Sequence, residues 1–399
     1  MTSYRNTDPR PPIMDGSPPA LVPPPMEWDR APWNRWTFQH MREMTPTAEV
    51  WRGTGHSARL ERREENLDHL PVAGADGAAT TLSRLLDETY TDGFLVLKDG
   101  AVAYERYFNG MTPRTLHLSQ SMAKSVTGSV AGILVGRGVM DPDAPVTTYL
   151  PELEDTAWRG ASLQHVLDMT TGVRFVEAYE DPNSDIGRVD VACGWKPVPP
   201  AGDPAAEWPQ HMWDLILSFK ETVRPHGERF EYRSIETDVL AFAMERVTGR
   251  RLAELVSEEL WQKIGAEESA CFTVDRAGYA LADGGFNATL RDYARFGQLI
   301  LDGGRGIVPA EWIEATRSGH VHGPDFSPSM PEASYRNQFW VEDPRSRNLM
   351  CRGVFGQLIH VDFDARMVTV KLSSWPDFSS VSFSVATLAA VHTIADALK

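Results

Sequence analysis

Residues 93–108 read GFLVLKDGAVAYERYF, and this stretch decides the fold. Residues 94–97 form an apolar run that predicts a strand. Asp99-Gly100 is a hairpin turn signal, and residues 101–108 have the composition of a returning strand. The stretch therefore predicts a β-hairpin near the beginning of the folded chain.

A helix rich in small residues is predicted after the hairpin. Residues 121–136 read SMAKSVTGSVAGILVG, and Gly128 and Gly132 permit the helix to pack closely against its neighbours. Asp141-Pro142 is expected to end it. Beyond it, residues 145–270 have mainly helical periodicity, whereas the runs 354–361 and 367–373 resemble strands and precede a closing helix at 385–398.

Strands near both ends of the chain, with helices between them, indicate the fold class. We expect an α/β (α+β) fold: an antiparallel sheet built from both termini and flanked by helices, with an inserted, mostly helical lobe. The predicted domains are a proline-rich N-terminal extension (1–45), a sheet domain (46–115 and 272–399) and a mainly helical domain (116–271). A ligand site is expected in the cleft between sheet and helices.

The composition excludes several classes of function. Of the 399 residues, 42% are hydrophobic and 24% are charged, which is the balance of a globular protein and not of a disordered chain. The formal charge is −16 without a local basic patch, so nucleic acids and membrane surfaces are poor candidate partners. The expected partner is a small molecule.

Targeting signals and cofactor motifs are not evident. The N-terminus shows no signal-peptide pattern, no stretch is apolar enough to span a bilayer, and three scattered cysteines argue against a disulfide framework, so a cytoplasmic location is expected. The common metal and nucleotide signatures are missing, and His320 and His322 have the context of loop residues rather than metal ligands. The sequence predicts no metal and no cofactor.

One catalytic signature is present, Ser121-Met122-Ala123-Lys124. In an S-x-x-K at helical spacing, the hydroxyl and the amine lie on the same face and can meet. A neutral amine near Ser121 could take the hydroxyl proton and create a nucleophile, and the backbone N–H groups at the helix N-terminus would favour a developing anion. Alone the tetrapeptide is weak evidence, because a serine and a lysine that face solvent and have no catalytic role can have the same spacing.

Two further segments complete a resemblance: Tyr232-Arg233-Ser234, a variant of Y-x-N, and Arg352-Gly353-Val354, expected at the start of a late strand. Together with the S-x-x-K they resemble the serine β-lactamase and penicillin-binding superfamily, and within its class C and esterase branch the 6-aminohexanoate-dimer hydrolases, which degrade nylon oligomers. The similarity runs from about residue 31 to the C-terminus. It implies a β-lactamase-like fold and a serine hydrolase acting through an acyl-enzyme on short linear amides.

The resemblance also implies catalytic roles. Ser121 matches the acylated nucleophile, and Tyr232 matches a tyrosine that relays a proton to the leaving group. Lys124 matches the base that activates the serine, a role that requires a pKa lowered by burial and by nearby positive or polar groups. The backbone N–H groups of Ser121 and Val354 match the oxyanion hole. Without the resemblance, Tyr232 would be read as a core aromatic residue.

Three further residues match substrate contacts. Tyr179 matches a tyrosine that hydrogen-bonds the scissile amide, Asp190 an acid that holds the substrate ammonium, and Trp340 an aromatic residue that closes over the substrate. Each has a structural alternative: loop packing for Tyr179, a surface charge for Asp190 and a core position for Trp340. A homodimer is suggested by the resemblance alone.

Departures from the superfamily pattern leave the substrate open. Cys351-Arg352-Gly353 stands where many members have K-T-G, whose lysine helps to hold the β-lactam carboxylate, and this argues against β-lactamase activity. The expected substrate is the 6-aminohexanoate linear dimer or a similar short ω-amino amide, with esterase activity on short acyl esters. A carboxylesterase or acyltransferase without useful amidase activity, and a covalent acyl-binding sensor, are the alternatives.

Overall fold

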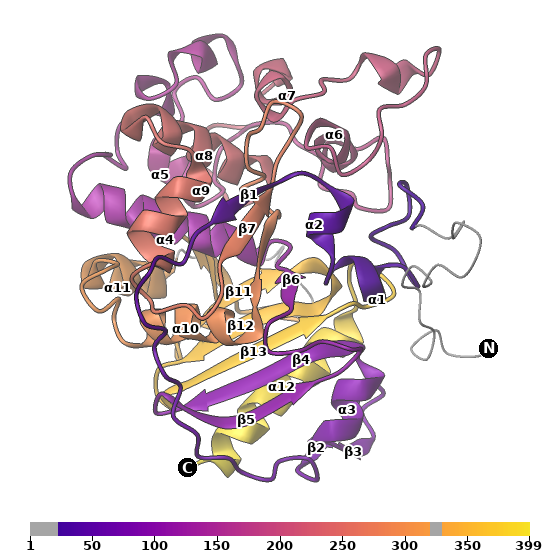
Figure 1. Ribbon diagram of the computed structural model, residues 1–399. Coiled ribbons are helices and arrows are strands. Elements are labelled where there is room, and N and C mark those ends of the chain that lie inside the picture. Colours follow the sequence, from indigo (N-terminus) through magenta and orange to yellow (C-terminus); the bar gives the residue numbers. More distant parts are fainter. Residues whose placement is uncertain (1–22, 320–328) are drawn as a thin grey trace.

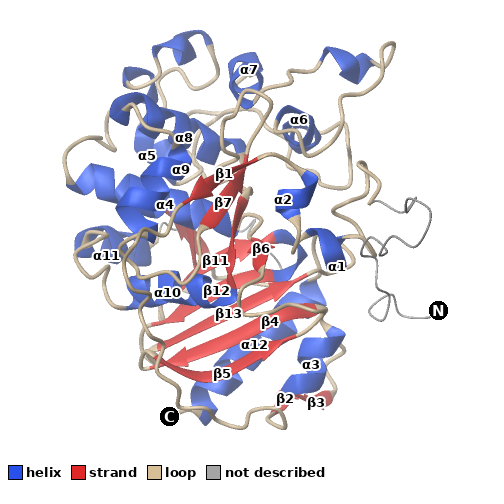
Figure 2. Ribbon diagram, in the orientation of Figure 1, coloured by secondary structure: helices blue, strands red, loops and turns tan. Residues whose placement is uncertain are grey.

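The structure is a computed structural model that describes residues 23–319 and 329–399. Within these residues, seven strands form one antiparallel sheet, in which segments from early and late in the chain lie side by side (Figures 1 and 2). The expected α/β fold with such a sheet is confirmed. In sheet order the strands are β5 Ala101–Tyr107, β4 Thr91–Lys98, β13 Met367–Ser373, β12 Gln357–Asp362, β11 Leu349–Gly353, β10 Phe339–Val341 and β9 Ser334–Arg336.

The predicted hairpin is confirmed, and it explains the apolar run in β4. Lys98 pairs with Ala101 across the turn, while the other edge of β4 pairs with β13. Side chains alternate between the two faces of a strand, and both faces of this sheet are covered. Leu95 and Leu97 therefore enter one hydrophobic core, and Phe94 and Val96 enter another.

Helices cover the two faces of the sheet. α10 Leu290–Leu301 packs on β4, β12 and β13 on one face. On the other face, α12 Val381–Ala397 and α3 Leu82–Glu88 share a core with the sheet. α12 passes behind the sheet in the view of Figure 1.

A mainly helical region lies above the sheet in Figure 2. A smaller antiparallel sheet borders this region in the described part of the chain. The domain limits at residues 45, 115 and 271 remain a prediction. The smaller sheet has the order β1 Thr47–Val50, β7 Ala270–Thr273, β8 Phe286–Thr289 and β6 Leu116–Leu118, and β2 Pro71–Ala73 pairs with β3 Ala79–Thr81. The remaining α-helices are α1 Asn34–Thr37, α2 Met41–Met44, α4 Met122–Gly136, α5 Leu163–Leu167, α6 Asp185–Ala192, α7 Met212–Ser218, α8 Ile235–Thr248, α9 Leu252–Val256 and α11 Ala310–Ser318.

α4 is buried on nearly every side, and its glycines make this possible. A Cβ at Gly128 would lie 2.6 Å from the Asn337 carbonyl oxygen, and one at Gly132 would lie 2.5 Å from the Trp312 indole. The helix ends at Gly136, the last residue of the predicted range, and it stops before Asp141-Pro142 is reached. Gly138 has a φ of 69°, and the bonds from Gly138 N to Val135 O and Val139 N to Leu134 O close the last turn.

The strand predicted over residues 354–361 is also corrected. Gly353 is the last residue of β11, and a short 3₁₀ turn, Val354–Gly356, leads into β12. Arg352-Gly353-Val354 therefore lies at a strand end. In the described ranges no helix is long and apolar enough to cross a membrane. His320 and His322, and residues 1–22 of the proline-rich extension, lie outside the described residues.

Candidate active site

Ser121 occupies the N-terminal end of α4 and lines a cavity of about 220 Å³. The residue before it, Gln120, has a φ of 49°, in the left-handed region that is costly for residues other than glycine. The Ser121 side chain makes no capping bond to its own helix. Its hydroxyl is therefore available to the neighbouring amine.

That amine belongs to Lys124, which is 1% exposed. Its Nζ lies 3.0 Å from Ser121 Oγ and 2.7 Å from the Asp283 carbonyl oxygen. Tyr232 also takes part in side-chain hydrogen bonds with Lys124 and Ser121. An ammonium has three protons to donate, so these three neighbours can satisfy it completely. The structure thus brings the three predicted catalytic side chains together.

The protonation state of this group differs from the sequence-based prediction. Burial by itself disfavours the ammonium, but the acidic groups of Tyr232, Asp283 and Glu177 outweigh this effect and raise the pKa of Lys124 above its ordinary value. The predicted lowering of this pKa is wrong, because the amine is surrounded by acids. Burial also raises the pKa of Tyr232, so both groups hold their protons in the resting site.

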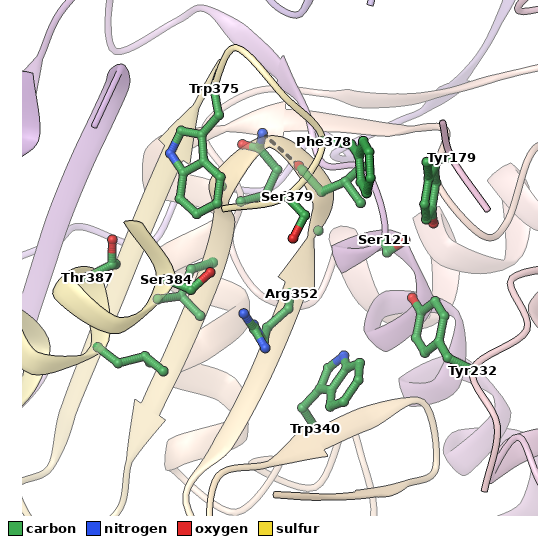
Figure 3. Close-up of a pocket in the computed structure, with 16 residues that line it drawn as sticks. Ser121, Tyr179, Tyr232, Trp340, Arg352, Trp375, Phe378, Ser379, Ser384 and Thr387 are labelled. Carbon is green, nitrogen blue, oxygen red and sulfur yellow. Dashed lines mark hydrogen bonds between the residues drawn. The ribbon is translucent and has the colours of Figure 1, made fainter. Parts of the chain in front are cut away.

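Tyr232 belongs to an aromatic wall on one side of the cavity. Its ring stacks on Trp340 of β10 with centroids 5.5 Å apart, and it meets Tyr335 of β9 edge to face at 6.0 Å. Trp340 also lines the cavity, beside Tyr232 in Figure 3. The predicted lid residue is therefore a wall residue in this structure, in contact with the tyrosine expected to relay protons.

Tyr179 lines the cavity next to Tyr232 and is held by an acid that the sequence analysis missed (Figure 3). Its hydroxyl donates to Glu177 Oε1 at 2.6 Å, and its ring stacks on Phe378 at 5.2 Å. Glu177 also accepts from the Ser234 backbone N–H at 2.8 Å. Because Ser234 lies two residues after Tyr232, Glu177 connects the segments that carry both tyrosines. The only sequence signal for Glu177 is its place two residues before Tyr179.

Both predicted oxyanion residues line the cavity, and the residues that precede them, Gly353 and Gln120, pack closely because Gly353 has no side chain. A Cβ at Gly353 would lie 2.6 Å from the Ser119 carbonyl oxygen and 2.9 Å from Gln120 Cβ. The end of β11 therefore packs directly on the segment that leads into Ser121. Val354 follows this contact and lines the same cavity.

Asp190 is placed differently from the other predicted residues. It lies in α6 and does not line the cavity. Burial and the negative charge of Asp29 raise the pKa of its carboxyl to about 7, although the charge of Lys196 opposes this. The structure therefore does not bring Asp190 to the cavity wall, where an ammonium ligand was expected.

Arg352 is a cavity residue that the sequence analysis named only as part of a motif. Figure 3 shows its guanidinium between Trp340 and Ser384. It contacts the Met330 sulfur at 3.1 Å and lies 5.8 Å from the Trp340 ring centroid. Burial lowers its pKa to about 10. Within the described ranges no carboxylate pairs with it.

Comparisons with known proteins place this site in a family. A family model described as beta-lactamase matches residues 78–392. The chain belongs to the beta-lactamase family. It is an enzyme, a hydrolase, and the family resemblance read from the sequence is confirmed.

Individual relatives refine this similarity. The chain is 38% identical over 363 residues to a 6-aminohexanoate-dimer hydrolase of Paenarthrobacter ureafaciens, and the match covers 88% of each chain. A structure from Bacillus anthracis, provisionally assigned as a 6-aminohexanoate-dimer hydrolase, is similar with a TM-score of 0.86 at 32% identity, covering 96% of this chain and 98% of that one. A penicillin-binding protein from Bacillus halodurans shares the fold, with a TM-score of 0.59 and 17% identity, over 78% of this chain and 99% of that one.

The raised pKa of Lys124 leads to a test of its role. A base must lose its proton before it can act, so the nucleophilicity of Ser121 should increase as the pH rises from neutral toward the pKa of Lys124. The rate at which a fluorophosphonate probe labels Ser121, followed by mass spectrometry, measures this. In Lys124→Arg the labelling rate should fall roughly a hundredfold, because a guanidinium does not deprotonate in this range.

Ser121→Ala is the control for this experiment and should not be labelled. If Lys124→Arg were labelled as fast as the wild type, Lys124 would have only a structural role. A labelling rate that is independent of pH would contradict a base with a raised pKa.

Proposed function

We propose that this hydrolase cleaves a short linear amide through an acyl-enzyme on Ser121, with the 6-aminohexanoate linear dimer or a similar ω-amino amide as substrate. The observation that carries the proposal is the 3.0 Å contact between Ser121 Oγ and Lys124 Nζ at the cavity. The similarity to a 6-aminohexanoate-dimer hydrolase across most of both chains supports this choice of substrate.

Acylation begins when Lys124 has lost one proton. The neutral amine still donates to the Asp283 carbonyl and to Tyr232, and its lone pair accepts the proton of Ser121. Ser121 Oγ then attacks the amide carbon, and the carbonyl oxygen becomes an anion. The N–H groups of Ser121 and Val354 stabilise this anion, each contributing on the order of 3 kcal/mol.

Collapse of this intermediate requires a proton on the leaving nitrogen. Tyr232 bonds to both Ser121 and Lys124, so it can pass the proton that Lys124 has taken up to the departing amine. The C–N bond breaks, the amine leaves, and the acyl group remains on Ser121. Water then attacks the ester carbon and gives a proton to the same pair of groups. The bond between that carbon and Ser121 Oγ breaks, the pair of groups returns the proton to Oγ, and the acid leaves.

The cavity also favours substrates with a charged end. Arg352 is partly desolvated and no carboxylate of the described residues pairs with it, so a substrate carboxylate beside its guanidinium would offset the cost of that desolvation. An ω-amino acid dimer carries such a carboxylate. The role of Asp190 toward the ammonium end remains a prediction, because Asp190 does not line the cavity and burial raises the pKa of its carboxyl to about 7.

Turnover of the linear dimer by the purified protein tests the proposal. The wild type should release 6-aminohexanoate, measured by chromatography, because it has nucleophile, base and oxyanion donors at one cavity. Ser121→Ala should lose this activity, and incubation of the wild type with a slow substrate should add the acyl mass to the peptide that contains Ser121. A wild type that hydrolyses p-nitrophenyl esters but not the dimer would favour the carboxylesterase alternative.

Tyr179 separates amide from ester cleavage. An amine is a poor leaving group that needs a proton, whereas p-nitrophenolate leaves without one. Tyr179→Phe keeps the ring that stacks on Phe378 and removes only the hydroxyl. We expect kcat/KM for the dimer to fall roughly a hundredfold, with little change for a p-nitrophenyl ester. Equal losses on both substrates would mean that the hydroxyl only supports the structure.

Arg352 should determine the preference for an anionic end. A charge-assisted bond corresponds to about a tenfold to hundredfold difference in kcat/KM between the dimer and its carboxamide. Arg352→Gln should lose that preference while keeping activity on the carboxamide. Arg59→Gln, at a side chain that is 85% exposed, is the matched control and should behave as the wild type. If Arg352→Gln retained the full preference, the carboxylate would bind elsewhere.

A further inference from the structure

A second cluster of ligand-type side chains lies where β10, β12 and α12 meet. It consists of Glu342, which follows β10, His360 in β12 and His392 in α12. One potential ligand atom of each residue lies within 4.8 Å of those of the other two. The hydrolysis proposed above uses none of these groups.

Both imidazoles direct the same ring nitrogen at one carboxylate. His360 Nε2 lies 3.0 Å from Glu342 Oε2, and His392 Nε2 lies 2.7 Å from Glu342 Oε1. Two histidine nitrogens and one carboxylate are a donor set that binds Zn²⁺ and other first-row divalent ions while leaving positions open for water. The three donors come from three different elements, so the fold assembles them.

We propose that Glu342, His360 and His392 form a binding site for a divalent transition-metal ion, for which Zn²⁺ is the best match. Donor atoms around a tetrahedral Zn²⁺ lie roughly 3.4 Å apart when each is about 2 Å from the ion. The change from the hydrogen-bonded arrangement is therefore small. Each imidazole would present its Nε2 lone pair to the ion and keep its proton on Nδ1. For His360 this tautomer is open, because no neighbour in the described residues forms a hydrogen bond with its Nδ1.

The surroundings of the cluster suit a cation that enters from solvent. The side chain of His392 is 49% exposed, that of Glu342 is 10% exposed and that of His360 is fully buried, so an ion can reach the cluster from the side of His392. Asn348 Nδ2 donates to Glu342 Oε2 at 3.3 Å and helps to orient the carboxylate. The carboxylates of Asp343 and Asp362 add negative charge nearby.

The cluster also adjoins the wall of the active-site cavity. Glu342 and His360 each lie two residues beyond a cavity residue on the same strand run, Trp340 and Leu358 respectively. His392 lies four residues, about one helical turn, beyond Leu388 in α12. An ion at this site would therefore hold α12 against the sheet beside the cavity.

Metal binding can be measured without any enzyme assay. The full-length protein is treated with EDTA, dialysed, and titrated with ZnCl₂ by calorimetry, while CoCl₂ is added in parallel and followed by its visible absorption. We expect one equivalent of each ion to bind, and ZnCl₂ to raise the Tm because the ion binds the folded state. His392→Gln should weaken Zn²⁺ binding at least tenfold and abolish the rise in Tm.

Two variants make the result decisive. Glu342→Gln keeps the shape of the side chain and should also lose binding, while circular dichroism shows that both variants are folded. His56→Gln, at an exposed histidine outside the cluster, is the matched control and should bind as the wild type does. The proposal is overturned if the wild type shows no saturable binding, or if His392→Gln and Glu342→Gln bind Zn²⁺ as tightly as the wild type. Binding lost only when His320 and His322 are replaced would also overturn it.

Discussion

The burial of one amine constrains the arrangement of the whole site. Lys124 needs three acceptors in a place that water cannot reach, and the fold supplies them from three parts of the chain: the Ser121 hydroxyl, the Asp283 carbonyl and Tyr232. The helix that carries this amine must therefore be buried as well. The small residues of this helix let it fit between the sheet and the helical region. The acids around Lys124 raise its pKa and so favour the charged form of the amine in the resting site.

The cavity is built where strand ends and loops from both structural regions meet. β11 contributes Arg352 and Gly353 at its last residues, and β10 contributes Trp340. Tyr179 and Tyr232 come from irregular segments of the helical region and are joined through Glu177. Rigid strands thus hold Trp340, Arg352 and Gly353, while hydrogen bonds between loops hold the two tyrosines at the same cavity.

Much of this could be predicted from the sequence because the signals are local. The hairpin at Asp99-Gly100 and the helix after Ser121 depend on neighbouring residues, and the S-x-x-K brings its two groups together by helical spacing alone. The turn after Gly353 could not be predicted from neighbouring residues. It forms where Gly353 packs on Ser119 and Gln120, which are more than two hundred residues away in the chain. Glu177 and Arg352 acquire their roles from neighbours that no spacing rule reveals, as do Glu342, His360 and His392.

The pairing of β4 with β13 has a consequence for how the molecule is made. Residues 91–98 cannot complete their place in the sheet until residues 367–373 exist, so the central pairing closes a very long loop, and folding is expected to be slow. During synthesis on the ribosome, one edge of β4 stays unpaired until β13 has been made. Until then the apolar run of residues 94–97 lacks the helices and strands that cover it in the folded protein. Such an edge readily recruits other chains. A nascent or truncated chain that lacks β13 would therefore depend on chaperones to avoid aggregation.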